Sequence, residues 1–169
     1  QGLSNFELYG KTVGLIGLGN IGSLVASMLK PFGAEVKYFK PIRCSPDLEE
    51  RLAMTYTPFE ELIKQVDILS LHCPLTAQTA GLIGENQLAS MKRGAIIINT
   101  ARGALIDETA LINALKAGHI AFAGLDVFSA EPLPKSSPFL GIDNVILTPH
   151  ISGVTYDSFL AMVREGINN

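Results

Sequence analysis

The segment that decides the fold is Thr12-Val13-Gly14-Leu15-Ile16-Gly17-Leu18-Gly19-Asn20-Ile21-Gly22, near the start of the chain. Its first five residues form a short apolar run, which is typical of a buried strand. A glycine-rich turn follows directly and leads into a pattern of helical period that extends to Lys30. A strand, a Gly-x-Gly-x-x-Gly turn and a helix in this order are the context in which such a turn binds a dinucleotide.

The three glycines of this turn have different physical roles. Gly17 permits the tight turn, Gly19 lets the backbone approach a pyrophosphate, and Gly22 lets the helix pack closely on the strand. The helix start also presents unpaired N–H groups to an anion. The alternative is a strand–helix turn that uses glycine only for its backbone angles, and the flanking strand and helix patterns argue against it.

Strand-like and helical segments alternate through the rest of the chain. The sequence predicts strands at Thr12–Ile16, Glu35–Phe39, Asp67–Leu71, Ala95–Asn99, Phe122–Asp126 and Val145–Leu147. It predicts helices at Ile21–Lys30, Phe59–Lys64, Glu108–Ala117 and Thr155–Ile167, and a long loop at Phe128–Asp143. Because parallel strands need crossover helices, we expect an α/β fold of the Rossmann type, a doubly wound parallel sheet with helices on both faces.

Composition limits the classes of function. The chain has 169 residues, of which 47% are hydrophobic and 17% charged, so it fits one globular domain. A net charge of -3 without basic runs argues against nucleic acid and anionic membranes as partners. The apolar runs are too short to span a bilayer, and residues 1–10 lack the pattern of a secretion signal. Cys44 and Cys73 are too few for a disulfide framework or a Cys/His metal site, so we expect no metal and a cytoplasmic location.

The end of the second predicted strand bears on which nicotinamide cofactor is bound. An NAD site places Asp or Glu about 20 residues beyond the glycine turn, where it binds the ribose 2′-hydroxyl. This chain has Lys40 there, with Arg43 close behind. Both cations would attract the 2′-phosphate of NADP, which a carboxylate would repel. The sequence therefore favours NADP over NAD, and solvated loop cations beside an NAD site are the alternative.

Three side chains suited to the reduction of a keto acid, Arg102, Glu131 and His150, follow in this order. Hydride transfer to a carbonyl carbon leaves charge on its oxygen, so the site needs a proton donor and a cation. A histidine exchanges a proton near neutral pH, and a carboxylate beside it stabilises its charged form. An arginine can hold the carboxylate of a 2-keto acid with two parallel hydrogen bonds. Found singly, each would be an ordinary loop residue.

Five ordered motifs resemble those of the D-isomer-specific 2-hydroxyacid dehydrogenases, which include D-lactate, glyoxylate/hydroxypyruvate and 3-phosphoglycerate dehydrogenases. The motifs are Gly17-Leu18-Gly19-Asn20-Ile21-Gly22, His72-Cys73-Pro74-Leu75-Thr76 with Thr79, Asn99-Thr100-Ala101-Arg102-Gly103, Leu125-Asp126-Val127-Phe128 with Glu131-Pro132, and Thr148-Pro149-His150-Ile151-Ser152-Gly153. This resemblance covers nearly the whole chain and implies an NAD(P)-dependent oxidoreductase.

The resemblance implies a role for each member of the trio. His150 is the general acid/base, Glu131 pairs with it, and Arg102 binds the substrate carboxylate and carbonyl oxygen. Asp126 is implied to bind the nicotinamide carboxamide, and Lys40 stands where the family usually carries its ribose-binding Asp. Together with the charge argument, the cofactor-binding set is Gly17, Gly19, Asn20, Ile21, Gly22, Lys40, Arg43, Cys73, Pro74, Thr79, Thr100, Ala101, Arg102, Asp126, His150 and Gly153.

The resemblance also implies a larger enzyme. The family builds its substrate domain from about 100 residues before the nucleotide domain and a short tail after it. We therefore expect residues 1–11 to be a linker from an absent substrate domain and residues 12–169 to be the dinucleotide-binding domain. The expected partners are a small 2-keto or 2-hydroxy acid, that substrate domain and a second copy in a homodimer. The alternative is a dinucleotide-sensing regulatory module like the corepressor branch of the family, since one fold supports both.

Overall fold

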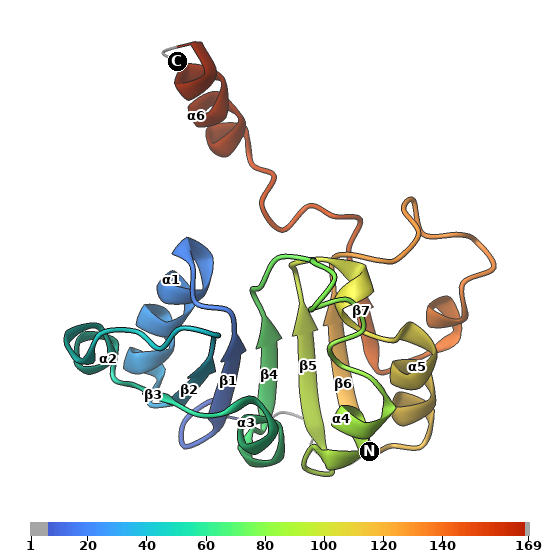
Figure 1. Ribbon diagram of the computed structural model, residues 1–169. Helices are drawn as coiled ribbons and strands as arrows, with labels where there is room; N and C mark the ends of the chain where they lie inside the picture. Colours follow the sequence, from blue (N-terminus) through green and yellow to red (C-terminus); the bar gives the residue numbers. More distant parts are fainter. Residues whose placement is uncertain (1–6, 168–169) are drawn as a thin grey trace.

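The computed structural model describes residues 7–167, whose strands form a seven-stranded parallel sheet (Figure 1). The strands are β1 (Thr12–Ile16), β2 (Glu35–Phe39), β3 (Met54–Tyr56), β4 (Ile68–Leu71), β5 (Ala95–Asn99), β6 (Ile120–Leu125) and β7 (Val145–Leu147). Their order in the sheet is β3-β2-β1-β4-β5-β6-β7. The chain therefore builds one half of the sheet outward from β1 and returns to build the other half from β4. This is the doubly wound fold that the sequence predicts.

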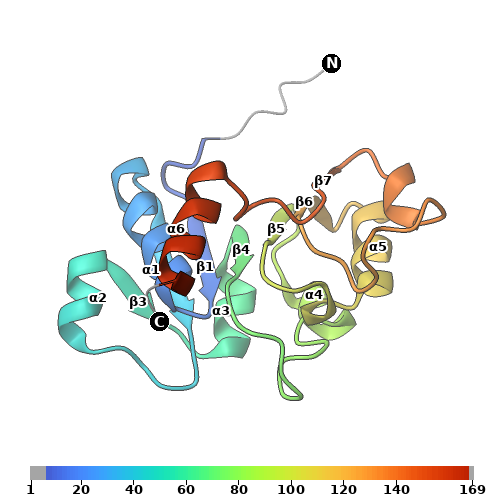
Figure 2. The same cartoon turned by 90° about the horizontal axis from the view of Figure 1, so that it is seen from above.

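Helices lie on both faces of the sheet, as Figure 2 shows from above. Helices α1 (Asn20–Leu29) and α2 (Pro46–Leu52) cover one face beside β1, β2 and β3. Helices α3 (Phe59–Gln65), α4 (Glu85–Ser90) and α5 (Glu108–Lys116) cover the other face. All five residues of β1 are buried between the two layers, because β1 is a central strand with helices above and below it.

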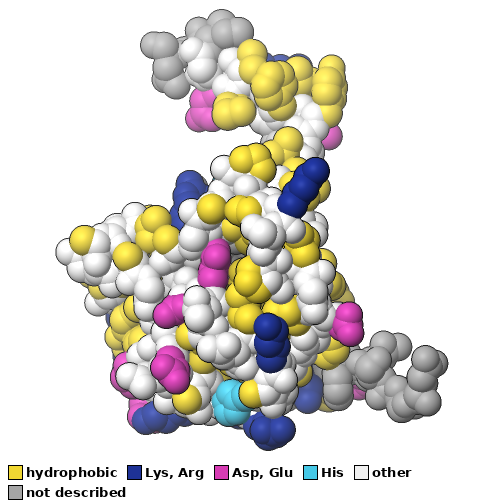
Figure 3. Space-filling model, turned by 90° about the vertical axis from the view of Figure 1, so that its right-hand side faces the viewer, with side chains coloured by type: hydrophobic (Ala, Val, Ile, Leu, Met, Phe, Trp, Pro, Cys, Tyr) yellow, Lys and Arg dark blue, Asp and Glu magenta, His cyan; other side chains and the backbone are white. Residues whose placement is uncertain are grey.

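The last helix, α6 (Tyr156–Ile167), stands apart from the sheet at the end of an extended stretch of chain (Figure 1). Apolar side chains lie on its surface (Figure 3). Phe159 and Met162 of this helix are 55% and 64% exposed. No helix among residues 7–167 has both the length and the apolar character needed to cross a membrane. Of the predicted linker, residues 1–6 lie outside the described residues, and Leu8 packs against the core beneath α1.

The predicted strands match the structure closely, but two α-helices and one strand among residues 7–167 were not predicted. The strand predicted from Asp67 begins at Ile68, and the Asp67 carboxylate accepts a hydrogen bond from the N–H of Thr12. The strand predicted at Phe122–Asp126 begins earlier and ends at Leu125, so Asp126 belongs to the following turn. The unpredicted elements are α2, α4 and β3, which have seven, six and three residues. Such short segments show too little periodicity to identify.

Candidate active site

The predicted site residues gather in loops at the carboxyl ends of the strands, which form the upper edge of the sheet in Figure 1. A groove of about 590 Å³ is lined by Ile21, His72, Cys73, Pro74, Leu75, Thr100, Ala101 and Arg102. A second pocket, of about 450 Å³, is lined by Phe128, Glu131, Pro132, Leu133, Pro149 and His150. The first therefore holds residues predicted to bind cofactor, and the second holds two of the three predicted catalytic residues.

The glycine turn leaves the start of α1 open. Gly17 has φ +91°, and a Cβ there would lie 2.7 Å from backbone atoms of His72 and Cys73. A Cβ on Gly22 would lie 2.5 Å from the carbonyl oxygen of Gly17. By contrast, a Cβ on Gly19 would meet no protein atom within 4 Å, and among the described residues no side chain caps the helix. The free space beside Gly19 and the uncapped N–H groups fit a bound pyrophosphate.

The wall of the groove after β4 carries no charge. Burial lowers the pKa of His72, which keeps its ring neutral, and the Nε2 atom of that ring lies 3.0 Å from the hydroxyl of Ser70. Burial also raises the pKa of the Cys73 thiol, so this residue lines the groove as a thiol and is no nucleophile. Among residues 7–167, no group of three or more His, Cys, Asp and Glu side chains is placed to hold a metal ion.

The turn that carries Arg102 is shaped by a residue to which the sequence assigned no role, Asn99 at the end of β5. Asn99 is 1% exposed. Its Oδ1 accepts the N–H of Ala101 at 3.0 Å, and its Nδ2 donates to the carbonyl oxygen of Arg102 at 2.9 Å. Arg102 is exposed, and its Nη1 donates to the carbonyl oxygen of Ala101 at 2.5 Å. An Asn at the end of an apolar strand, just before Thr100-Ala101-Arg102-Gly103, is the signal that could have identified this turn.

The next residue, Gly103, packs against the backbone of the loop after β6. Gly103 is buried, and a Cβ there would overlap the carbonyl group of Phe128 and the N–H of Ser129. The two backbones therefore touch directly, which only glycine permits. This contact sets the Arg102 turn and the Phe128 turn at a fixed spacing.

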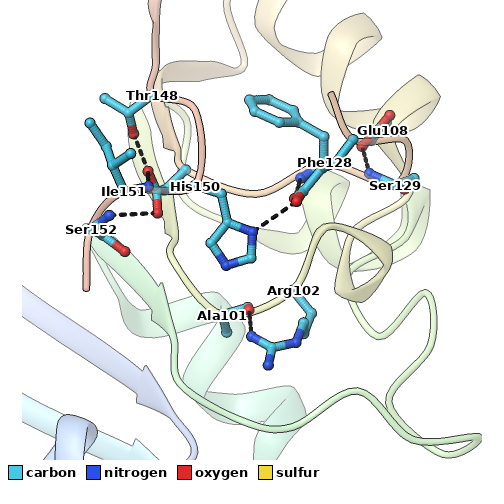
Figure 4. Close-up of polar contacts among 11 residues, drawn as sticks. Ala101, Arg102, Glu108, Phe128, Ser129, Thr148, His150, Ile151 and Ser152 are labelled. Atoms are coloured by element: carbon cyan, nitrogen blue, oxygen red, sulfur yellow. Dashed lines mark hydrogen bonds and ion pairs between the residues drawn. The ribbon is translucent and has the colours of Figure 1, made fainter. Parts of the chain in front are cut away.

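Glu131 and His150 form the ion pair that the sequence predicts (Figure 4). Nδ1 of His150 lies 2.8 Å from Oε2 of Glu131, while Oε1 of Glu131 accepts the N–H of Phe128 at 2.9 Å. The hydrogen bonds from His150 and Phe128 lower the pKa of the Glu131 carboxyl and outweigh the opposing effects of burial and of Asp126. An ionised carboxylate can only accept, so Nδ1 of His150 is the donor and Nε2 is left for a substrate.

Asp126 holds the loop that carries His150. It is 2% exposed and accepts hydrogen bonds from the Thr148 hydroxyl at 2.5 Å and from the N–H groups of Ile151 and Ser152, each at 2.9 Å. Burial acts to raise the pKa of Asp126, but these hydrogen bonds outweigh it and hold the pKa well below its usual range. His150 itself has φ +55°, an unusual backbone angle that the surrounding bonds maintain. Binding of the nicotinamide carboxamide by Asp126 stays a prediction.

Replacing Asp126 by asparagine is expected to lower the free energy of unfolding by about 2 kcal/mol, because an amide group would face N–H donors in a buried place. The stabilisation from the carboxylate is present above its ordinary pKa of 3.8 and is lost as pH falls through the lowered pKa. Urea titrations at neutral and at strongly acidic pH should therefore show a difference from the unmodified chain that shrinks in acid. Asp143→Asn, on the exposed surface, is the control. An Asp126→Asn chain of unchanged stability would contradict this role.

Nine of the predicted cofactor-binding residues do not line the groove or the pocket. Five of these are Gly17, Gly19, Asn20 and Gly22 at the glycine turn and Asp126, and the other four are Lys40, Arg43, Thr79 and Gly153. Arg43 is paired with Glu49 through two hydrogen bonds of 2.8 Å, and its hydrogen bonds lower the pKa of Glu49 to about 2. The Thr79 hydroxyl donates to the carbonyl oxygen of Pro74 at 2.7 Å and shapes the turn there. Lys40 is half-buried just after β2, and Gly153 is exposed in the chain that leads to α6.

Comparison with known proteins shows the family of the chain. Residues 1–152 match the family described as D-isomer specific 2-hydroxyacid dehydrogenase, NAD binding domain. The chain is 46% identical to the glyoxylate reductase of Korarchaeum cryptofilum over 164 residues, which cover 97% of this chain and 49% of that protein. It is 43% identical to the D-3-phosphoglycerate dehydrogenase of Mycobacterium leprae, over 92% of this chain and 29% of that protein.

A solved structure shows the same fold. The D-lactate dehydrogenase of Lactobacillus jensenii with NAD+ is 39% identical to this chain, with a TM-score of 0.88, and the match covers 98% of this chain and 53% of that one. The chain thus spans about half the length of the glyoxylate reductase and of this D-lactate dehydrogenase. By its motifs, its fold and these similarities, the chain belongs to the D-isomer-specific 2-hydroxyacid dehydrogenase family and matches its NAD-binding domain.

Proposed function

We propose that this chain is the dinucleotide-binding half of an enzyme that transfers a hydride between a nicotinamide dinucleotide and a 2-keto acid or D-2-hydroxy acid. The observation that carries this proposal is the Glu131–His150 ion pair of 2.8 Å at the edge of the sheet where the glycine turn opens. Figure 4 shows the imidazole of His150 directed toward the segment of Ala101 and Arg102. A proton donor and a cation thus lie in the same region, as the reduction of a keto acid requires.

The side chains divide the chemistry between them. A bound nicotinamide supplies or accepts the hydride. Charged His150 gives the proton on Nε2 to the carbonyl oxygen of the keto acid, which becomes a hydroxyl group, and neutral His150 takes it back in the reverse direction. Glu131 stabilises the charged ring and holds its orientation. Arg102 binds the substrate carboxylate, for which it must release its bond to the Ala101 carbonyl oxygen.

The names of the relatives and the positive charge of Arg102 support a substrate class. The curated relatives include glyoxylate reductases and D-3-phosphoglycerate dehydrogenases, which supports a small anionic 2-keto acid as substrate. We propose that a second domain forms the other wall of the cleft. This domain would correspond to the part of those relatives that this chain does not match. Turnover by the 169 residues alone should then be slow, since the substrate would be held from one side only.

We further propose that NADP(H) is preferred to NAD(H), with Lys40 as the residue that recognises the 2′-phosphate. Glu49 already engages Arg43 through two hydrogen bonds of 2.8 Å, so Arg43 would have to exchange a carboxylate for a phosphate. Lys40 follows β2 directly, where a carboxylate would select NAD. The preference for NADP, which depends on attraction of its 2′-phosphate, therefore rests mainly on the charge of Lys40.

Titration of the chain with NADPH and with NADH, followed by nicotinamide fluorescence, tests both the proposal and the cofactor preference. We expect tighter binding of NADPH. Lys40→Ala should weaken NADPH binding about tenfold by removing a charge-assisted hydrogen bond, and should leave NADH binding nearly unchanged. Arg43→Ala is the matched control and should have the smaller effect. Tighter binding of NADH would contradict the preference, and failure to bind either cofactor would contradict the proposed function.

A further inference from the structure

The turn at Phe128 and Ser129 contacts two carboxylates through consecutive N–H groups (Figure 4). The N–H of Phe128 donates to Oε1 of Glu131 at 2.9 Å, and the N–H of Ser129 donates to Oε1 of Glu108 at 2.7 Å. Glu131 belongs to the loop after β6, whereas Glu108 is the first residue of α5. The loop that carries the partner of His150 is therefore tied to a helix by a charged hydrogen bond.

Helix α5 gives Glu108 a fixed position. Asp107 caps the helix by accepting the N–H of Ala110 at 3.0 Å, and Leu111 and Leu115 anchor it in the core. Glu108 is half-buried at the start of the helix, where the helix dipole attracts a negatively charged side chain. Its carboxylate is thus a firmly held acceptor, and the loop after β6 is aligned by it.

Other contacts hold the same turn from different sides. Gly103 touches the peptide between Phe128 and Ser129 from the Arg102 turn. The Phe128 ring is buried and lies 6.2 Å from the ring of Phe139. These contacts position the turn by packing, and neither of them is a hydrogen bond to the Ser129 N–H. The hydrogen bond to Glu108 sets the direction of the Ser129 N–H, and through the turn that of the Phe128 N–H.

We propose that Glu108 is a positioning residue for the hydride-transfer reaction, which makes this inference rest on the proposed function. By holding Ser129, it keeps the Phe128 N–H directed at Oε1 of Glu131, and so keeps Oε2 directed at Nδ1 of His150. The charged groups that act on Glu131 are His150 and Asp126. Glu108 lines neither the groove nor the pocket, so in this proposal it acts through the backbone of the turn.

The test compares three variants of the chain: Glu108→Ala, Glu108→Gln and the control Glu85→Ala. Gln keeps an acceptor oxygen at the same reach and should restore the bond, whereas Ala should not. Glu85 is an exposed residue that begins α4 as Glu108 begins α5, so its removal changes a helix start of the same kind. The readout is the ¹⁵N spectrum of the His150 ring in mildly alkaline buffer, which distinguishes a proton on Nδ1 from one on Nε2.

In the unmodified chain the proton of neutral His150 should lie on Nδ1, because Glu131 accepts it there. In Glu108→Ala, a substantial fraction should move to Nε2, while Glu108→Gln and Glu85→Ala should keep the original spectrum. In the full-length enzyme, kcat should fall about tenfold in Glu108→Ala with little change in KM for the cofactor, as expected for a lost hydrogen bond to a charged group.

An unchanged His150 spectrum in a folded Glu108→Ala chain would overturn the inference. So would the same spectral change in Glu85→Ala. If Glu108→Ala does not fold, Glu108→Asp replaces it, because Asp keeps the charge at the helix start but is too short to reach Ser129. The spectrum needs neither substrate nor turnover. An unchanged His150 spectrum in Glu108→Ala therefore leaves the proposed function standing. Failure of the unmodified chain to bind a dinucleotide would contradict the proposed function, whatever the His150 spectrum shows.

Discussion

From the proposed function, His150→Asn is expected to lower kcat for the reduction of a 2-keto acid by about 10²- to 10⁴-fold, the usual contribution of a positioned general acid. His150 has φ +55°, an angle that asparagine accepts more readily than alanine does. Asparagine therefore removes the proton donor with little change in the backbone. The rate of nicotinamide oxidation in a single turnover, at saturating cofactor, measures this effect.

The control for this variant is His119→Asn. Nε2 of His119 lies 3.1 Å from the carbonyl oxygen of Met91, outside the groove and the pocket of the site. This variant should retain nearly the full rate. A His150→Asn enzyme that keeps a tenth or more of the normal rate would rule out His150 as the principal proton donor. Dinucleotide binding should change only a few-fold in either variant, because the pyrophosphate is expected at the start of α1.

The second large effect is expected from two alanine substitutions in the glycine turn. Gly17→Ala should lower the free energy of unfolding by more than about 2 kcal/mol, because a left-handed angle disfavours a side chain and the new Cβ would meet backbone atoms. Gly19→Ala should change stability by less than about 1 kcal/mol, since open space surrounds that position. It should nevertheless weaken dinucleotide binding about a hundredfold, because the methyl group would occupy the place of the pyrophosphate.

Urea unfolding and fluorescence titration with NADPH, made on both variants, separate the two effects. Gly17→Ala should lose stability and binding together, whereas Gly19→Ala should lose binding alone. Normal NADPH binding by Gly19→Ala would mean that the dinucleotide does not approach the start of α1. The pair thus tests the binding site independently of catalysis.

The sequence predicted the larger elements of the fold because each carries its own signal. The five buried residues of β1, for example, read as an apolar run followed at once by glycines. Helix α2 was missed although Ser45 and Pro46 form a recognisable helix start, because the helix has no buried residue to give it a period. Strand β3 has three residues and pairs only with β2, so nothing local identifies it.

The sequence predicted which residues form the site. It did not predict most of the hydrogen bonds and ion pairs that hold them in place. Pairing of Glu131 with His150 was expected and is present. The bonds of Asp126 to the loop that carries His150 could not be predicted, because they depend on a backbone turn that no periodic pattern describes. The pairing of Arg43 with Glu49 was missed for a related reason. Glu49 lies on α2, and a helix that is not predicted cannot place its side chains.

The strictly parallel sheet also has a consequence for how the chain folds. The bond from Thr12 to Asp67, which joins β1 to the start of β4, links residues 55 positions apart. No strand pair of this sheet is a hairpin that could form early from neighbouring residues. High contact order of this kind slows folding. During synthesis on the ribosome, β1 cannot pair with β4 until β2 and β3 have also been synthesised. In that interval β1 lacks one of its two neighbours, and a chaperone could bind it.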